Sequence, residues 1–167
     1  MMKSNLLFDF TVDKENATIH VTREFDAPIQ LVWQAWTQAE LLDQWWAPKP
    51  YRTETKSLDF REGGRWLYSM VGPHNDRHWC RADYQKIEEG KLITWEDAFC
   101  DENGQDNGGK PNSHWTTKFT EIDGITTVDV ILAHDSLESL ETQIQMGFQE
   151  GFTMALGNLD ELVENMQ

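Results

Sequence analysis

The sequence predicts a single domain of the α+β class, with an antiparallel β-sheet and helices packed on one face of it. Three observations predict this class: a hydrophobic period of two in the middle of the chain, helical spacing near its C-terminus, and short turns between the predicted strands. A length of 167 residues with 39% apolar side chains is sufficient for one hydrophobic core. No tandem repeat or linker divides the chain. We therefore expect one domain over residues 17–164, preceded by an extension, residues 1–16, that either joins the first strand or is flexible.

The first predicted elements are a strand and two short helices. Residues 17–25 alternate apolar and polar side chains and are rich in β-branched residues, which is typical of a half-buried strand. Asp26 is a suitable N-cap ahead of Pro28, so a short amphipathic helix is predicted over residues 28–36. A second short helix is predicted over residues 38–46, because two prolines follow it.

The middle of the chain predicts six further strands. Each is a run with period-two alternation, and turns containing Gly, Asn or Asp separate most of them. These short turns predict hairpins, and therefore a meandering antiparallel sheet. The polar segment from Asp101 to Asn112 interrupts the series and is expected to be a mobile loop at one end of the sheet. The six predicted strands are residues 52–60, 64–72, 78–88, 91–99, 114–122 and 125–134.

The last predicted element is one long amphipathic helix over residues 137–164, because apolar residues recur there at steps of three and four. At 1.5 Å per residue, such a helix is about 40 Å long and crosses a whole sheet. Gly147 and Gly151 remove side-chain volume from its inner face. We therefore expect a cavity between this helix and a curved sheet.

The charge of the chain excludes several classes of partner. The formal net charge is −15, and residues 101–167 contain only Lys110 and Lys118 as basic residues. Nucleic acid and anionic membranes are not expected partners, because this negative charge repels polyanions and no run of Lys or Arg is present. No apolar stretch approaches the roughly 20 residues of a spanning helix, and no secretory signal is recognisable. We therefore expect a cytoplasmic protein with reduced cysteines, either a monomer or a homodimer.

Alternate residues of the predicted strands place aromatic and other apolar side chains on one face of the sheet. Small-molecule pockets have walls of this kind, although a fully packed core explains the same residues. A shift of one residue in strand phase would turn each set to the other face. The candidate ligand-binding residues, which include two from the C-terminal helix, are Trp66, Tyr68, Met70, His78, Cys80, Trp95, Trp115, Thr117, Phe148 and Phe152.

The Trp45-Trp46 pair ends the second predicted helix. Adjacent residues of a helix point about 100° apart, so at most one of these rings faces the core squarely. The favoured interpretation is that the pair holds the two short helices against the sheet. The alternative is a place at the mouth of the pocket.

No catalytic or metal-binding pattern stands out. His74, His78 and Cys80 lack the spacing of a zinc site, and the segment from Asp101 to Asn112 begins like a calcium loop but lacks its later ligands. We therefore predict no cofactor, no metal and no catalytic residue. Most titratable residues of the central strands are expected to be solvated on the outer face of the sheet; they are Arg65, Arg81, Asp83, Glu96 and Asp97. His78 is instead expected to be a polar group of the pocket.

Several short motifs follow one another in a characteristic order. They are Arg23-Glu24-Phe25-Asp26-Ala27-Pro28 with Val32-Trp33, then Trp45-Trp46, Glu62-Gly63-Gly64-Arg65-Trp66, Leu92-Ile93-Thr94-Trp95 and Gly151-Phe152. Together they resemble the activator of heat-shock protein 90 ATPase homologue group, in the START-like, birch-pollen-allergen-like helix-grip superfamily, also called SRPBCC. The resemblance implies a curved antiparallel sheet of six to seven strands around a long C-terminal helix, with two short helices after the first strand. It also implies an apolar cavity, which in this superfamily holds lipids, sterols, polyketides or aromatic products.

Three functions follow from these observations. The first is non-catalytic binding of a small hydrophobic or aromatic ligand, because aromatic side chains line the predicted pocket and no reactive motif is present. The second, which the family name implies, is co-chaperone-like stimulation of a heat-shock protein 90 ATPase. The third is a cyclase or dehydratase acting on an aromatic or polyketide-like substrate, and it requires an acid or base inside the cavity.

Overall fold

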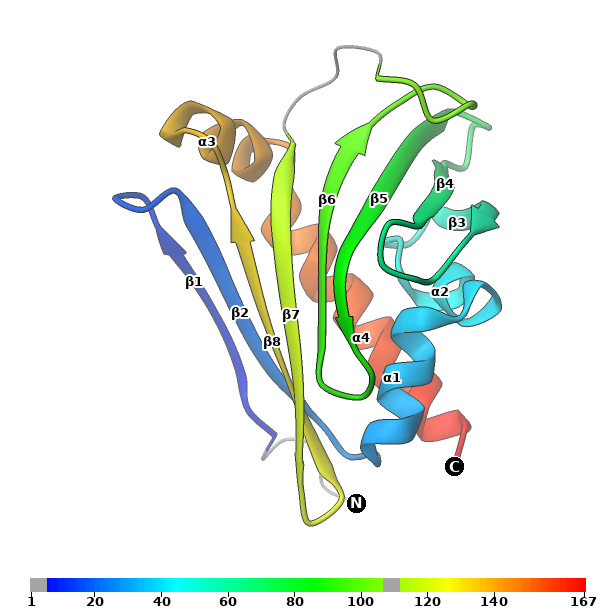
Figure 1. Ribbon diagram of the computed structural model, residues 1–167, viewed down its shortest axis with the longest axis vertical. Coiled ribbons are helices and arrows are strands. Elements are labelled where there is room, and N and C mark those ends of the chain that lie inside the picture. Colours follow the sequence, from blue (N-terminus) through cyan, green and yellow to red (C-terminus); the bar gives the residue numbers. More distant parts are fainter. Residues whose placement is uncertain (1–5, 107–111) are drawn as a thin grey trace.

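A computed structural model describes residues 6–106 and 112–167 of the protein. In these residues it contains one eight-stranded antiparallel sheet and four helices (Figure 1). The strands are β1 (Phe8–Asp13), β2 (Thr18–Phe25), β3 (Arg52–Leu58), β4 (Arg65–Val71), β5 (Arg77–Glu88), β6 (Leu92–Phe99), β7 (Ser113–Ile122) and β8 (Ile125–Ala133). The helices are α1 (Ile29–Thr37), α2 (Ala39–Trp45), α3 (Leu137–Gln145) and α4 (Phe148–Asn165).

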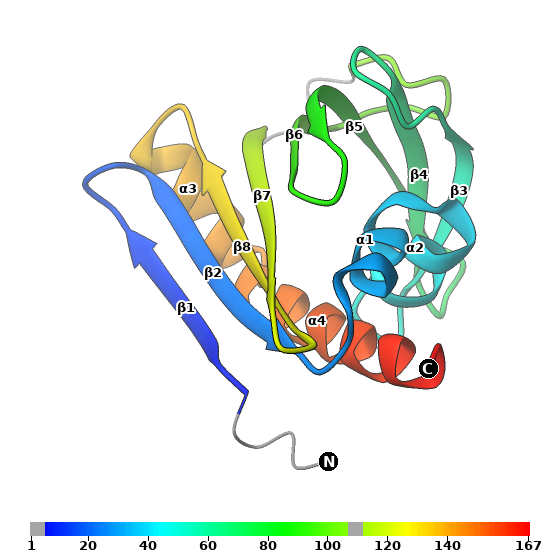
Figure 2. The same ribbon diagram turned by 60° about the horizontal axis from the view of Figure 1, so that its bottom comes forward.

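The sheet has the strand order β1-β2-β8-β7-β6-β5-β4-β3. Strands β3 to β8 are joined consecutively, as the short turns predict, and β2 pairs with β8 to bring the N-terminal strands onto the same sheet. The sheet curves around α4, which runs across its concave side (Figure 2). Helix α2 packs on β3 and α4 and covers the opposite end of the sheet from α3. The predicted α+β helix-grip architecture is confirmed, with eight strands rather than six or seven.

The core lies between the concave face of the sheet and α4. Alternate residues of β8 are buried from Thr126 to Leu132, because successive side chains of a strand point to opposite faces. On α4 the buried residues recur at helical spacing. They are Phe152, Ala155, Leu156, Leu159 and Val163.

The N-terminal extension contains a strand of its own. Residues Phe8–Asp13 form β1, which pairs antiparallel with β2 from Phe8 opposite Arg23 to Asp13 opposite Thr18. The alternatives of joining the first strand or being flexible are therefore wrong for these residues, and residues 1–5 lie outside the described part of the chain. The strand was missed because it is short and mostly exposed, which weakens the alternation of apolar and polar residues.

The predicted N-cap of the first helix is also wrong. Pro28, not Asp26, is the N-cap of α1, and it provides no side-chain hydrogen bond. The amide of Ile29 instead donates to the Glu121 carboxylate at 2.7 Å. A carboxylate distant in sequence therefore satisfies a first-turn amide that a local side chain was expected to bind.

The long C-terminal helix is interrupted. Helix α3 ends at Gln145 and α4 begins at Phe148, with Gly147 in the left-handed conformation at φ +88° between them. The Gly147 amide donates to the carbonyl of Ile144, which closes α3 in the way glycine commonly ends a helix. The prediction of one continuous helix over residues 137–164 was therefore wrong, because the apolar spacing continues across a residue that the backbone uses as a break.

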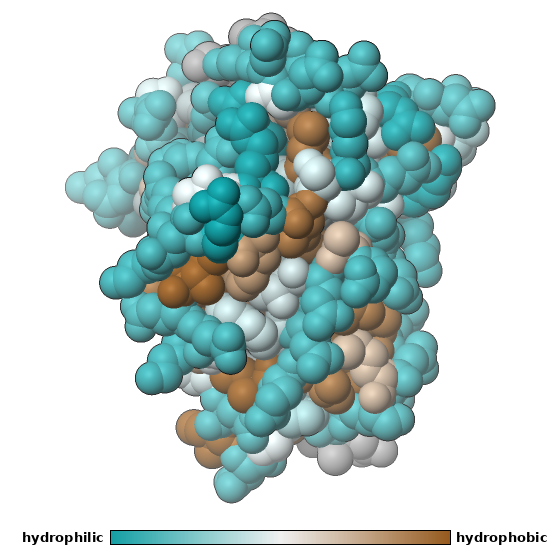
Figure 3. Space-filling model, turned by 45° about the vertical axis from the view of Figure 1, so that its right-hand side comes forward, coloured by the Kyte–Doolittle hydropathy of each residue, from teal (hydrophilic) through white to brown (hydrophobic). Residues whose placement is uncertain are grey.

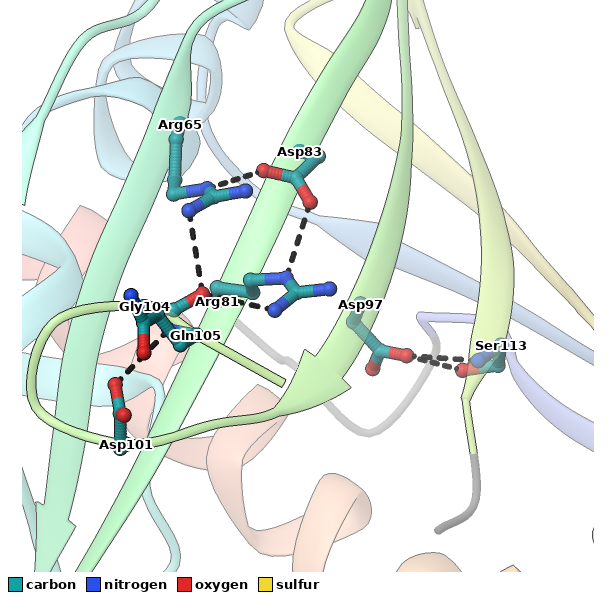
Figure 4. A network of polar contacts seen from close by, with 8 residues as sticks. All are labelled: Arg65, Arg81, Asp83, Asp97, Asp101, Gly104, Gln105 and Ser113. Carbon is teal, nitrogen blue, oxygen red and sulfur yellow. Dashed lines mark hydrogen bonds and ion pairs between the residues drawn. The ribbon is translucent and has the colours of Figure 1, made fainter. Parts of the chain in front are cut away.

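The polar segment after β6 is partly attached to the sheet. The Asp101 carboxylate accepts hydrogen bonds from the amides of Asn103 and Gln105, both at 2.9 Å. The Gly104 carbonyl accepts from the guanidinium groups of Arg65 and Arg81 (Figure 4). Hydrogen bonds therefore attach this part of the loop to β4 and β5, and the mobility expected of the loop stays a prediction. Residues 107–111 of the predicted loop lie outside the described residues.

Hydrophilic residues predominate on the face shown in Figure 3, and hydrophobic residues form a broken band between them. None of the helices in residues 6–106 and 112–167 is both long enough and apolar enough to cross a membrane.

Candidate functional site

A cavity of about 230 Å³ lies between the sheet and the C-terminal helices. Its walls come from β4, β5, β6 and β7, from α3 and α4, and from the two residues Trp46 and Pro48 after α2. An engineered cavity of about 150 Å³ in another protein holds benzene, so this volume suits a molecule of one or two rings. The residues that line it are Trp46, Pro48, Tyr68, Met70, Cys80, Asp97, Ala98, Phe99, Trp115, Gln143, Met146, Gly147, Phe148, Gly151 and Phe152.

The space exists because the helices cover the sheet incompletely at this position. The break between α3 and α4 places Met146 and Gly147 at the cavity, and Gly151 lines it without a side chain. A Cβ atom on Gly151 would lie 3.5 Å from Pro48. The predicted cavity is therefore present, although two helices rather than one border it.

The wall of the cavity is mainly aromatic. The rings of Phe148 and Phe152 stack at a centroid distance of 5.3 Å, and Trp115 stacks on Trp95 at 5.1 Å. Trp46 approaches both sets, with its ring centroid 5.6 Å from Trp115 and 6.2 Å from Phe152. Such packed rings form a rigid apolar surface suited to a flat apolar molecule.

Six of the ten candidate ligand-binding residues line this cavity, which confirms the strand phase assumed for β4, β5 and β7. They come from three strands and α4. They are Tyr68, Met70, Cys80, Trp115, Phe148 and Phe152.

Three other candidates belong to the packed core instead. Trp66 stacks on Tyr68 at 3.9 Å and donates its indole N–H to the hydroxyl of Thr55. Trp95 lies behind Trp115, and Thr117 is completely buried. These residues share the concave face with the cavity residues, but neighbouring side chains cover them.

His78 was wrongly predicted to face the pocket. Its side chain is 54% exposed, and Nε2 lies 3.1 Å from the carboxylate of Asp76. Its ring also lies near that of Tyr51, at a centroid distance of 6.1 Å. These partners lie beside the start of β5, where the imidazole stays in contact with water.

Each residue of the tryptophan pair has a different environment. Trp45 is buried and donates its indole N–H to the carbonyl of Ala35 at 2.8 Å, which joins α2 to α1. Trp46 lines the cavity and donates to the hydroxyl of Tyr68 at 3.0 Å. The structural interpretation therefore applies to Trp45, and the pocket alternative applies to Trp46.

Asp97 is the acidic residue of the cavity, and its predicted place on the solvated outer face was wrong. Along β6 it lies two positions from both Trp95 and Phe99, so the three side chains point to the same face of the sheet. This period of two was the signal that places Asp97 on the concave face. Its Oδ1 accepts from the amide and the hydroxyl of Ser113 at 2.9 and 2.7 Å (Figure 4). Its Oδ2 accepts from the indole N–H of Trp115 at 2.9 Å.

Opposing effects act on the Asp97 carboxyl. Burial is the largest and raises its pKa, whereas the hydrogen bonds from Ser113 and Trp115 and the nearby His134 lower it. The net result is a pKa above the ordinary value of 3.8. The two hydrogen bonds from Ser113 and the one from Trp115 all favour the ionised form of Asp97, because a carboxylate is a pure acceptor.

The other titratable groups of the cavity are neutral. Burial raises the pKa of the Cys80 thiol to about 12 and holds the pKa of Tyr68 well above its usual range. Among the described residues, Asp97 is the only charged side chain that lines the cavity.

The remaining charged residues of the central strands do not line the cavity. Asp83 binds both Arg65 at 2.5 Å and Arg81 at 3.2 Å, and Glu96 pairs with His114 at 2.9 Å (Figure 4 shows the first group). The predicted outer face is therefore correct for Arg65, Arg81, Asp83 and Glu96. In residues 6–106 and 112–167, no three His, Cys, Asp or Glu side chains come together as metal ligands.

Solved structures share this fold over nearly the whole chain. Protein Ms6760 from Mycobacterium smegmatis is 29% identical, with a TM-score of 0.85 over 94% of this chain and 96% of that one. A protein from Staphylococcus epidermidis is 27% identical, with a TM-score of 0.82 over 94% and 95%. A protein from Arthrobacter aurescens is 25% identical, with a TM-score of 0.88 over 94% and 91%.

None of the curated proteins compared with the chain matches it. A family description does match, and it spans the first helix, the central strands and the two C-terminal helices. It covers residues 26–164, which include every residue of the cavity. Because this description matches most of the chain and the structure has the helix-grip fold, the chain belongs to the family of activator of Hsp90 ATPase homolog 1-like proteins.

Proposed function

We propose that this protein binds a small, largely apolar molecule of one or two rings in the cavity, without transforming it. The observation that supports this function is the cavity itself, about 230 Å³ in volume, with aromatic side chains on several sides. Pockets for small molecules combine apolar walls with a few polar groups in the same way. Here the polar groups are Asp97 and Gln143.

The size of the cavity also sets the expected affinity. A ligand of one or two rings buries on the order of 150–250 Å² of apolar surface, which contributes about 4–6 kcal/mol at about 25 cal/mol per Å². This range corresponds to dissociation constants between roughly 1 mM and some tens of micromolar. A screen must therefore use ligands at up to millimolar concentration.

The test uses naphthylmethanol, an uncharged two-ring probe, with binding followed by calorimetry and by tryptophan fluorescence. We expect saturable binding to the wild type and loss of binding in G151L, because a side chain at Gly151 enters the cavity. G157L is the matched control on the same helix, since Gly157 does not line the cavity and a Cβ there meets no atom within 4 Å. Absence of binding to the wild type, or equal binding to both variants, would contradict the proposal.

Catalysis is the second candidate, because Asp97 places an ionisable group inside the cavity. A carboxylate with a raised pKa is suited to accept a proton from a bound substrate. Turnover of an aromatic polyketide-like compound that D97N abolishes while binding persists would support this function over simple binding. Stimulation of a heat-shock protein 90 ATPase stays a prediction from the family resemblance.

A further inference from the structure

The charges around the cavity are unbalanced. In the described residues the lining includes the carboxylate of Asp97 but no Lys or Arg. His134 lies near Asp97 but does not line the cavity, and its Nε2 is hydrogen bonded to Oε1 of Gln143. An apolar pocket with one acidic group therefore lacks a permanent positive charge opposite it.

Asp97 also has an unused acceptor position. From the described residues, Oδ1 accepts two hydrogen bonds, both from Ser113, and Oδ2 accepts one, from Trp115. A carboxylate has about four acceptor positions, so one remains on Oδ2. Gln143, from α3, also lines the cavity, and its Oε1 retains a second lone pair beside the bond from His134.

We propose that the ligand of this cavity is an aromatic or other apolar amine that binds as a cation, with its ammonium group donating to Asp97. This inference rests on the proposed function and names the chemical class of its ligand. The ammonium provides the hydrogen-bond donors that the free acceptor positions require. The ring system of the ligand occupies the apolar part of the cavity.

The aromatic wall favours the same class of ligand. Trp46, Trp115, Phe148 and Phe152 present π-systems whose faces attract cations as well as apolar rings. The whole chain carries a formal net charge of −15, which attracts a cation toward the protein and repels an anion.

Neutral and acidic ligands satisfy the cavity less well. A carboxylic acid of the same shape brings a second negative charge beside Asp97 in an apolar environment, which costs binding energy. A neutral alcohol offers only one donor and no charge. An ammonium offers three donors and the charge that opposes Asp97.

The experiment compares three probes that share one ring system: naphthylmethylamine, naphthylmethanol and naphthoic acid. At neutral pH these are a cation, a neutral molecule and an anion. By calorimetry on the wild type, we expect the amine to bind at least about tenfold more tightly than the alcohol, and the acid to bind most weakly. This comparison does not depend on any variant being folded.

The variant D97N tests the role of the carboxylate. We expect it to weaken binding of the amine by about tenfold or more and to weaken binding of the alcohol by a smaller factor, because the alcohol carries no charge. D123N is the matched control, because it removes the same charge from an exposed residue in the turn between β7 and β8, and Asn tolerates the positive φ of 52° there.

The outcomes separate the inference from the proposed function. If the alcohol or the acid binds as tightly as the amine, or if D97N binds the amine as well as D123N does, the ammonium assignment is overturned while binding in the cavity stands. If none of the three probes binds the wild type, the proposed function fails together with the inference.

Discussion

Trp46 donates its indole N–H to the hydroxyl oxygen of Tyr68 at 3.0 Å, across 22 positions of the chain. The bond joins the end of α2 to β4 at the wall of the cavity. Both side chains are buried, with exposed fractions of 8% and 5%. The pair therefore fixes one side of the cavity before any ligand is present.

Removing the acceptor of this bond is expected to destabilise the fold. In Y68F the indole N–H of Trp46 loses the hydroxyl and remains buried, which costs about 1–3 kcal/mol of unfolding free energy. Urea denaturation followed by fluorescence measures this loss. Y51F is the control, because the Tyr51 hydroxyl bonds Asp76, whose side chain is 39% exposed, and its loss is expected to cost less than about 0.5 kcal/mol. Equal losses of unfolding free energy in the two variants would show that the buried Trp46–Tyr68 bond contributes no more to stability than the Tyr51–Asp76 bond.

Two glycine-to-alanine substitutions in the C-terminal helical region are expected to change stability in opposite directions. G147A forces a side chain into the left-handed conformation at φ +88° and is expected to lower stability by about 1–2 kcal/mol. G157A lies inside α4, where a Cβ meets nothing within 4 Å, and is expected to raise stability by about 0.5–1 kcal/mol. Thermal denaturation of the two variants checks the signs. A stabilising G147A would mean that α3 and α4 join into one helix without cost.

Asp97 is expected to make stability fall as pH rises. Burial raises the pKa of this carboxyl above its usual 3.8, so the folded state binds its proton more tightly than the unfolded state does. Its contribution is fully present below pH 3.8 and is lost as pH rises through the folded-state pKa. Urea titrations of wild type and D97N across this range measure it.

The comparison with D97N removes the titrations that the two proteins share. The difference in unfolding free energy, wild type minus D97N, is expected to decrease with increasing pH and then to level off. Any constant offset from the altered bonds to Ser113 and Trp115 does not affect the slope. A difference that increases with pH would show that the hydrogen bonds outweigh burial.

Cys80 is expected to be unreactive in the folded protein. Burial raises the pKa of its thiol from 9.0 to about 12, which lowers the thiolate fraction about a thousandfold at any pH below 9. In a C100S variant, where Cys80 is the remaining cysteine, the reaction with a disulfide reagent is expected to be about a thousandfold slower than in denaturant. Rapid modification in native buffer would show that solvent and reagent reach the cavity wall freely.

The local pattern of the sequence was sufficient for the elements of the sheet. The period of two from β3 to β8 predicted each strand and, for β4, β5 and β7, the face that turns inward. This works because successive residues of a strand point to opposite faces, so burial of one face produces an alternation of apolar and polar residues in the sequence. The short turns predicted the antiparallel neighbours for the same local reason.

The helix break shows where local pattern fails. Apolar residues keep helical spacing from Leu140 to Val163, and Gly147 falls within that spacing. Its backbone nevertheless adopts φ +88° and separates α3 from α4. Hydrophobic spacing records which residues face the core but not whether the backbone between them is continuous.

The sequence alone determined the α+β class, the antiparallel sheet and the aromatic character of its concave face, because these depend on residue type and periodicity along the chain. Only the tertiary structure decided which residues on that face are packed and which border open space. Trp66 and Trp95 are covered by neighbouring rings, whereas Tyr68, Asp97 and Trp115 lie where α3 and α4 leave a gap. That gap depends on how the helices cross the sheet, and this arrangement is set by contacts between residues far apart in the sequence.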